Sequence, residues 1–146
     1  NNLIKKNKLE AGHFIKKITK WMGLFGIILS LGLLFFASLV IRIVSGEAFQ
    51  QSIQILRILS FLPFIITVSN MLGTQTLLAF NFKRIFSMSI IIPSLLHIVL
   101  IFVVVPLFGV IGLAMLTIIT ESLIVIYRAT GIYKVRNFFM EGSNNQ

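Results

Sequence analysis

The feature that most constrains this chain is a set of long apolar runs that almost lack charge. They cover residues 21–44, 51–80, 85–105 and 110–127. A helix of about 20 residues crosses a hydrocarbon core about 30 Å thick. Only 12% of the 146 residues are charged and 57% are hydrophobic, which is too little charge to cover a soluble surface. The sequence therefore predicts an all-α integral membrane protein whose residues 21–128 form a bundle of four transmembrane helices.

Several classes of function find no support in the sequence. The chain has no cysteine, which excludes disulfides and thiolate metal sites. The net charge of +9 comes from basic residues beside the apolar runs, as in membrane proteins, so we expect no nucleic-acid partner. We find no glycine-rich phosphate loop, metal-ligand spacing or nucleophile–base pair. We therefore predict that the chain is not an enzyme and needs no metal or cofactor.

The basic residues predict an orientation. Residues 1–20 form either a helix on the membrane surface or a connector to an upstream helix, and 129–146 form a basic tail. Eleven lysines and arginines lie in these segments, in the turn 81–84 and at Arg128, against only Arg42 and Arg57 on the other side. The positive-inside rule then places both ends in the cytoplasm. We also expect the chain to be the C-terminal piece of a longer protein.

Local signals predict where the helices end, bend and pack. Gly46 is expected to end the first helix in a left-handed conformation, Pro63 to kink the second, and 106–109 to form an uncharged turn. Small residues four apart allow helices to approach closely, and such pairs occur at Gly26/Ser30 and Ser69/Gly73.

The second run carries polar residues that a purely structural span would not need. Gln50, Gln54 and Arg57 share one helical face, and Asn70 and Thr74 continue a polar stripe further along. A guanidinium there can bind a phosphate or an acidic sugar, and amides can bind hydroxyls. These five residues are our candidate substrate contacts. The alternatives are that Arg57 extends to lipid phosphates and that the amides only join helices.

Two further ionisable residues lie inside the predicted spans. Glu121 is a candidate for coupling transport to protons or sodium, and its alternative role is a static ion pair with Arg128. His97 follows Pro93 by one turn. It is a candidate proton relay, and its alternative role is to donate to the backbone carbonyl that the proline leaves free.

Three stretches carry a resemblance to a known family: GEAFQQSIQILRILSFLPFI, SNMLGTQTLLAFN and VPLFGVIGLAMLTIITESLIVIY. Their order resembles the C-terminal four helices of bacterial polysaccharide-unit flippases, the O-antigen and capsule flippases of the MATE-like exporter superfamily. The resemblance implies a protein of two helical bundles in the bacterial inner membrane. This chain would form most of the second bundle, and its partner would be the missing N-terminal bundle of the same protein.

The resemblance also implies an activity. Such flippases move undecaprenyl-pyrophosphate-linked oligosaccharide units for O-antigen and lipopolysaccharide synthesis from the inner to the outer leaflet by alternating access, in contact with membrane lipids. Arg57 would then meet the pyrophosphate. Two alternatives remain open: a MATE-type drug or small-solute exporter, and a non-transporting four-span membrane subunit.

Overall fold

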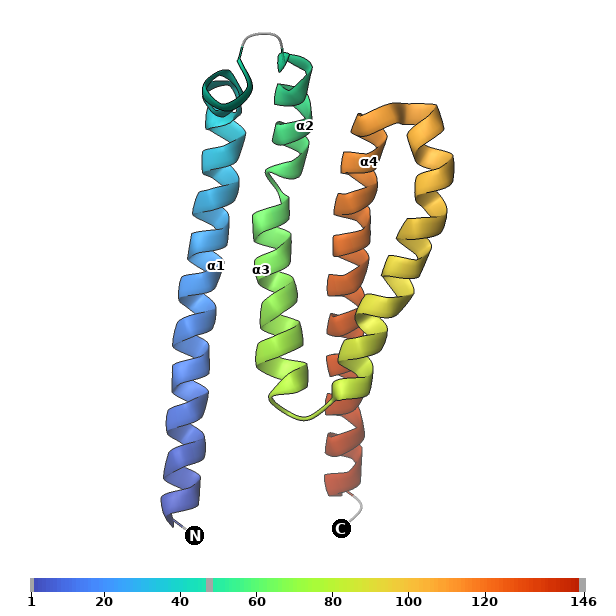
Figure 1. The fold of residues 1–146 in the computed structure, drawn as a ribbon. Helices are drawn as coiled ribbons and strands as arrows, with labels where there is room; N and C mark the ends of the chain where they lie inside the picture. The colour runs from blue at the N-terminus through green and yellow to red at the C-terminus, as the bar shows by residue number, and fades with distance from the viewer. Residues whose placement is uncertain (1, 47–48, 145–146) are drawn as a thin grey trace.

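The computed structural model describes the backbone of residues 2–46 and 49–144, and the side chains of 17–134 apart from 19, 47 and 48. The elements are α1 (Asn2–Ser45), α2 (Gln51–Leu59), α3 (Leu62–Leu72), the π-helix η2 (Gly73–Leu78) and α4 (Lys83–Asn144). Every element in this described part is helical, which confirms the predicted all-α class. The elements stand side by side and roughly parallel to one axis (Figure 1).

Helix α1 is continuous over 44 residues, so the backbone of the basic segment before residue 21 continues directly into the apolar run. The helix ends where Gly46 takes a φ of 81° and donates its N–H to the Arg42 carbonyl at 3.2 Å. Glycine adopts this left-handed conformation without the steric penalty of a β-carbon. The predicted helix end at Gly46 is confirmed. The placement of residues 1–20 at a membrane surface stays a prediction.

The second apolar run is divided into three helical pieces. Helix α2 ends at Leu59, and α3 restarts with Pro63 in its first turn, where the missing N–H costs nothing. The Phe64 N–H, left free by this restart, donates to the Ser30 hydroxyl of α1 at 3.1 Å. The predicted kink at Pro63 is therefore confirmed, and a side chain from the neighbouring helix satisfies one of the freed groups.

Helix α4 reverses direction at Gly109, whose φ of 60° and ψ of −148° are not helical. Residues 83–108, the first limb, and residues 110–144, the second limb, therefore run antiparallel beside each other (Figure 1). A β-carbon built on Gly131 of the second limb would lie 2.6 Å from a methyl carbon of Ile85 on the first, so the limbs touch at this end. The chain reverses at Gly109, the last residue of the predicted turn 106–109, whereas residues 106–108 are still helical.

The core of this bundle is small and most large apolar side chains are exposed. Phe35, Ile43 and Phe102 are 75%, 75% and 77% exposed, as expected for helices that face hydrocarbon rather than water. Within the described residues, three helical stretches are long and apolar enough to span a membrane: Lys20–Ser45, Gln51–Leu78 and Lys83–Lys134. The third contains the first limb of α4 and residues 110–134 of the second limb.

Close packing occurs where the sequence supplies small residues. A β-carbon on Gly26 of α1 would lie 2.5 Å from the Thr67 hydroxyl and 3.3 Å from the Pro63 carbonyl of α3. Together with the Ser30 hydrogen bond, this contact shows that the Gly26/Ser30 pair joins α1 to α3. The prediction that these residues serve helix packing is confirmed.

The turn conformation generates the first testable prediction. Replacing Gly109→Ala should destabilise the protein by about 1–3 kcal/mol, because this combination of φ and ψ is nearly restricted to glycine. Gly32→Ala is the matched control, since nothing lies within 4 Å of a β-carbon there and alanine favours a helix. Thermal unfolding in detergent should show a lower midpoint for the first variant and an equal or higher one for the second. Equal midpoints would contradict a strained turn at Gly109.

Candidate functional site

The most buried charged side chain in the described part is Arg128, on the second limb and only 4% exposed. Its Nε donates to the Ser89 hydroxyl on the first limb at 2.9 Å. Its Nη1 donates to both the carbonyl and the hydroxyl of Ser69 on α3, each at 2.7 Å. The guanidinium carbon also lies 4.8 Å from the ring centre of Phe86. The arginine is therefore held by oxygen acceptors and an aromatic face, as a buried charge requires.

The sequence provides space for this guanidinium by placing small residues around it. A β-carbon on Gly73 would lie 2.6 Å from Nη1, so no larger residue fits there without displacing the arginine. The Ser89 hydroxyl donates to the Phe86 carbonyl at 2.6 Å, which leaves its lone pairs free to accept from Arg128. The prediction that Ser69 and Gly73 allow another helix to approach is confirmed, since both contact α4, and they also accommodate the Arg128 side chain. Sequence reasoning missed this second role, because the sequence does not show which residues lie opposite one another.

A polar hollow of about 270 Å³ lies between the two limbs, one to two turns from Arg128. We call it the polar hollow; its lining residues are Ser94, His97, Ile98, Thr117, Thr120, Glu121 and Ile124. Both candidate ion-coupling residues, Glu121 and His97, border it from opposite limbs. Residues that are far apart in sequence thus share one partly buried space, which contains a carboxylate, an imidazole and several hydroxyls.

The hydrogen bonds in the polar hollow fit one tautomer of the His97 imidazole. The Thr120 hydroxyl lies 2.8 Å from the Leu116 carbonyl, to which it can donate. Nδ1 of His97 lies 2.7 Å from the Thr120 oxygen, and it is the donor in the tautomer that keeps the bond from Thr120 to Leu116. In a neutral imidazole this leaves Nε2 with a free lone pair. His97 thus contacts a side chain of the other limb, and the backbone carbonyl near Pro93 is not its partner.

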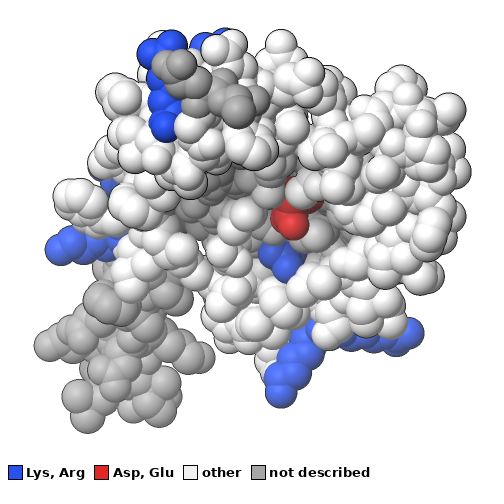
Figure 2. Space-filling view, turned by 45° about the horizontal axis from the view of Figure 1, so that its top comes forward, with Lys and Arg blue, Asp and Glu red and all other residues white. Residues whose placement is uncertain are grey.

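Glu121 and Arg128 lie seven residues apart on the second limb, on the same helical face. The carboxylate attracts the guanidinium electrostatically, while the hydrogen bonds of the guanidinium go to the two serines. Figure 2 shows acidic atoms directly beside basic atoms in a hollow of the surface. Arg128 therefore balances the negative charge of Glu121 without a direct hydrogen bond, and the carboxylate oxygens remain available to another partner. No group of three or more potential metal ligands occurs among the described residues.

The candidate substrate contacts lie in two groups, one along α2 and one on α3 and η2. Gln54 borders a depression of about 440 Å³ that also contains Gln51, Ile55 and Phe108. Arg57 is exposed and lies three positions past Gln54, on the same face of α2. Gln50, Asn70 and Thr74 are also exposed. The chain alone does not bring the five residues together into one site.

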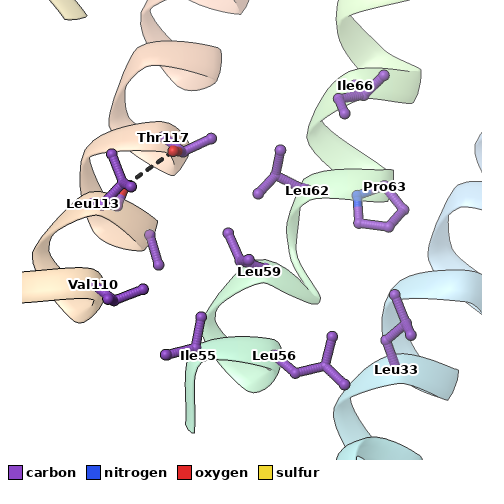
Figure 3. Close-up of a pocket in the computed structure, with 11 residues that line it drawn as sticks. Leu33, Ile55, Leu56, Leu59, Leu62, Pro63, Ile66, Val110, Leu113 and Thr117 are labelled. Carbon is purple, nitrogen blue, oxygen red and sulfur yellow. Dashed lines mark hydrogen bonds between the residues drawn. The ribbon is translucent and has the colours of Figure 1, made fainter. Parts of the chain in front are cut away.

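A larger, apolar pocket has a volume of about 650 Å³. It lies between α1, α2, α3 and the second limb (Figure 3). Ile55, Leu59 and Leu62 point across it toward Val110 and Leu113 of the second limb. The Thr117 hydroxyl is engaged with the Leu113 carbonyl at 2.9 Å, so this pocket presents almost no polar group to a ligand.

Comparison with known proteins relates the chain to O-antigen transporters. No protein family model and no solved structure matches it. A protein of Escherichia coli (strain K12) named "Putative O-antigen transporter" is 37% identical over 118 residues, which cover 81% of this chain and 28% of that protein. A protein of Shigella dysenteriae with the same name is 27% identical over 124 residues, covering 83% of the chain and 31% of that protein. The chain thus spans less than a third of either relative.

The hydrogen bond between the limbs generates the second testable prediction. Thr120→Val removes the acceptor of the His97 Nδ1–H and should cost about 1–2 kcal/mol, because a partly buried donor loses its partner. Thr117→Val is the matched control, since that hydroxyl bonds only to its own helix. Thermal unfolding in detergent should show the larger loss for Thr120→Val. Equal losses would contradict the contact between the limbs.

Proposed function

We propose that this chain is part of a membrane transporter that moves undecaprenyl-pyrophosphate-linked oligosaccharide units for O-antigen synthesis across the bacterial inner membrane. The observation that carries the proposal is the 37% identity, over 81% of the chain, to a relative named as an O-antigen transporter. The polar hollow supports it, because ionisable residues inside an apolar helical bundle are costly and are usually retained for function.

The proposed topology has four membrane crossings: α1, the α2–α3–η2 series, and the two limbs of α4. The reversal at Gly109 supports the division of α4, because the first limb then spans about 39 Å and the second about 53 Å, and each is long enough for one crossing. The start of α1 and the end of α4 lie at the same end of the bundle (Figure 1). Since most basic residues belong to that end, we place it in the cytoplasm.

Transport in this proposal proceeds by alternating access between this bundle and the N-terminal bundle of the same protein, in a MATE-like arrangement. Exposed Arg57 would bind the pyrophosphate or an acidic sugar with two parallel hydrogen bonds. Gln50, Gln54, Asn70 and Thr74 would bind sugar hydroxyls. Because these residues form two separate groups on one bundle, the second bundle would complete their cavity.

The polar hollow is the proposed ion-coupling site. The Glu121 carboxylate can take up a proton or attract a cation, and the free Nε2 of His97 offers a second basic atom. Because the two residues belong to opposite limbs, a change of charge on either one alters the attraction between the limbs. Such a change can therefore bias the bundle between two arrangements.

The transport role itself is tested by complementation. The intact protein containing this chain is expressed in a strain that lacks its own O-antigen transporter, and surface O-antigen is measured on electrophoretic gels. Restored surface O-antigen is expected. Failure to restore it, with the protein present in the membrane at the level of a functional transporter and a matching sugar unit supplied, would contradict the proposal.

Arg57→Ala in the intact protein should lower O-antigen export about tenfold or more, because a charged bidentate contact is worth about 1.5–3 kcal/mol. Arg42→Ala is the matched control, since Arg42 also lies outside the core, in the last turn of α1. Membrane levels of both variants should equal those of the parent. Equal export by the two variants would remove Arg57 from the proposed site.

Glu121→Gln should abolish the dependence of export on proton or sodium concentration, because the amide neither ionises nor attracts a cation as a carboxylate does. Ser122→Ala is the control, because Ser122 follows Glu121 in the sequence but borders a different pocket. Export is measured across a range of pH and sodium concentrations. An unchanged ion dependence in Glu121→Gln would show that the carboxylate has only a structural role.

A further inference from the structure

Contacts between the two limbs of α4 follow one register. Ser89 contacts Arg128 and His97 contacts Thr120. The two partners on the first limb are eight positions apart, and so are the two on the second limb. Both pairs lie symmetrically about the reversal at Gly109. The two contacts are therefore two levels of the same antiparallel pairing, about 12 Å apart along the limbs.

Arg128 also connects this pairing to a third segment. The Ser69 carbonyl that accepts from Nη1 also accepts the Gly73 N–H, at the point where α3 passes into the π-helix η2. One guanidinium thus joins the first limb, the second limb and the α3–η2 junction. A planar guanidinium fixes the directions of its donors, so its bonds define how these helices are aligned as well as how close they are.

We propose that Arg128 is a positioning residue that sets the register of the two limbs against α3 and thereby keeps Glu121 and His97 facing the same polar hollow. A slip by one helical turn moves a side chain by about 5.4 Å, which would separate His97 from Thr120. The role of the hollow in ion coupling rests on the proposed function. The register itself does not, and the two claims can be tested separately.

The register is measured by a disulfide between the limbs. A β-carbon built on Gly131 lies 4.0 Å from the β-carbon of Ile85, inside the range of about 3.5–4.5 Å found in disulfides. The chain has no cysteine of its own. The pair Ile85→Cys/Gly131→Cys is introduced into the intact membrane protein, with any cysteine outside this chain changed to serine. Oxidation should cross-link the limbs readily when Arg128 is present.

Arg128→Met in this background should lower the cross-linked fraction at least about fivefold, because a one-turn slip takes the sulfurs out of bonding range. Arg84→Met is the matched control, since Arg84 is an exposed arginine on the first limb. Arg128→Lys retains the charge without the planar fork of donors and should give an intermediate yield.

Gly73→Ala disturbs the same contact without changing any charge, because the added β-carbon would lie 2.6 Å from Nη1. It should also lower the cross-linked fraction. Gly23→Ala is its control, since nothing lies within 4 Å of a β-carbon there. If Arg128→Met does not accumulate in membranes, the Gly73→Ala and Gly23→Ala comparison decides the matter.

Parental cross-linking in both Arg128→Met and Gly73→Ala would overturn the proposal. Where cross-linking falls, the ion concentration for half-maximal export should shift at least about threefold in Gly73→Ala and not in Ser122→Ala. If the cross-linked fraction falls but the ion dependence of export stays unchanged, Arg128 does not position the residues of the polar hollow. Absence of any export by the parent would reject the proposed function and leave the cross-linking result valid.

Discussion

A guanidinium buried between helices must find its hydrogen-bond acceptors inside the protein, because the side chains around it exclude water. Arg128 finds them in the hydroxyl of Ser89 and in both oxygens of Ser69, and Phe86 covers it with an aromatic face. These acceptors belong to different segments of the chain. The arrangement of the first limb, the second limb and α3 is therefore tied to the solvation of one charge.

Apolar packing cannot define such an arrangement in this bundle. Most large apolar side chains are exposed, and a lipid tail is as good a neighbour for leucine as another leucine is. Helix contacts therefore depend on small residues, as at Gly26 and Gly131, and on hydrogen bonds such as those of Ser30 and Thr120. Polar groups in this protein hold the structure together and also form its candidate site, so the two roles overlap along the limbs of α4.

The polar hollow is complete within this chain, whereas the candidate substrate contacts are not. The polar hollow is formed within the chain, because Glu121 and His97 meet across the limb interface. Arg57 and Asn70 are exposed and lie on different helices, α2 and α3. This division fits a chain that spans less than a third of its relatives. The proposed coupling site needs one bundle only, whereas the proposed substrate cavity needs two.

Local chemistry in the sequence determined the helices, their ends and their bends. A left-handed glycine at 46, a proline at 63 and a glycine turn at 109 act on the few residues around them, so each could be predicted. The π-helix and the burial of Arg128 could not, because helical periodicity identifies the face of a residue and not the helix opposite. Only the tertiary structure decided that Arg128 meets Ser69 and that Glu121 shares a space with His97, since both depend on how segments far apart in the sequence align.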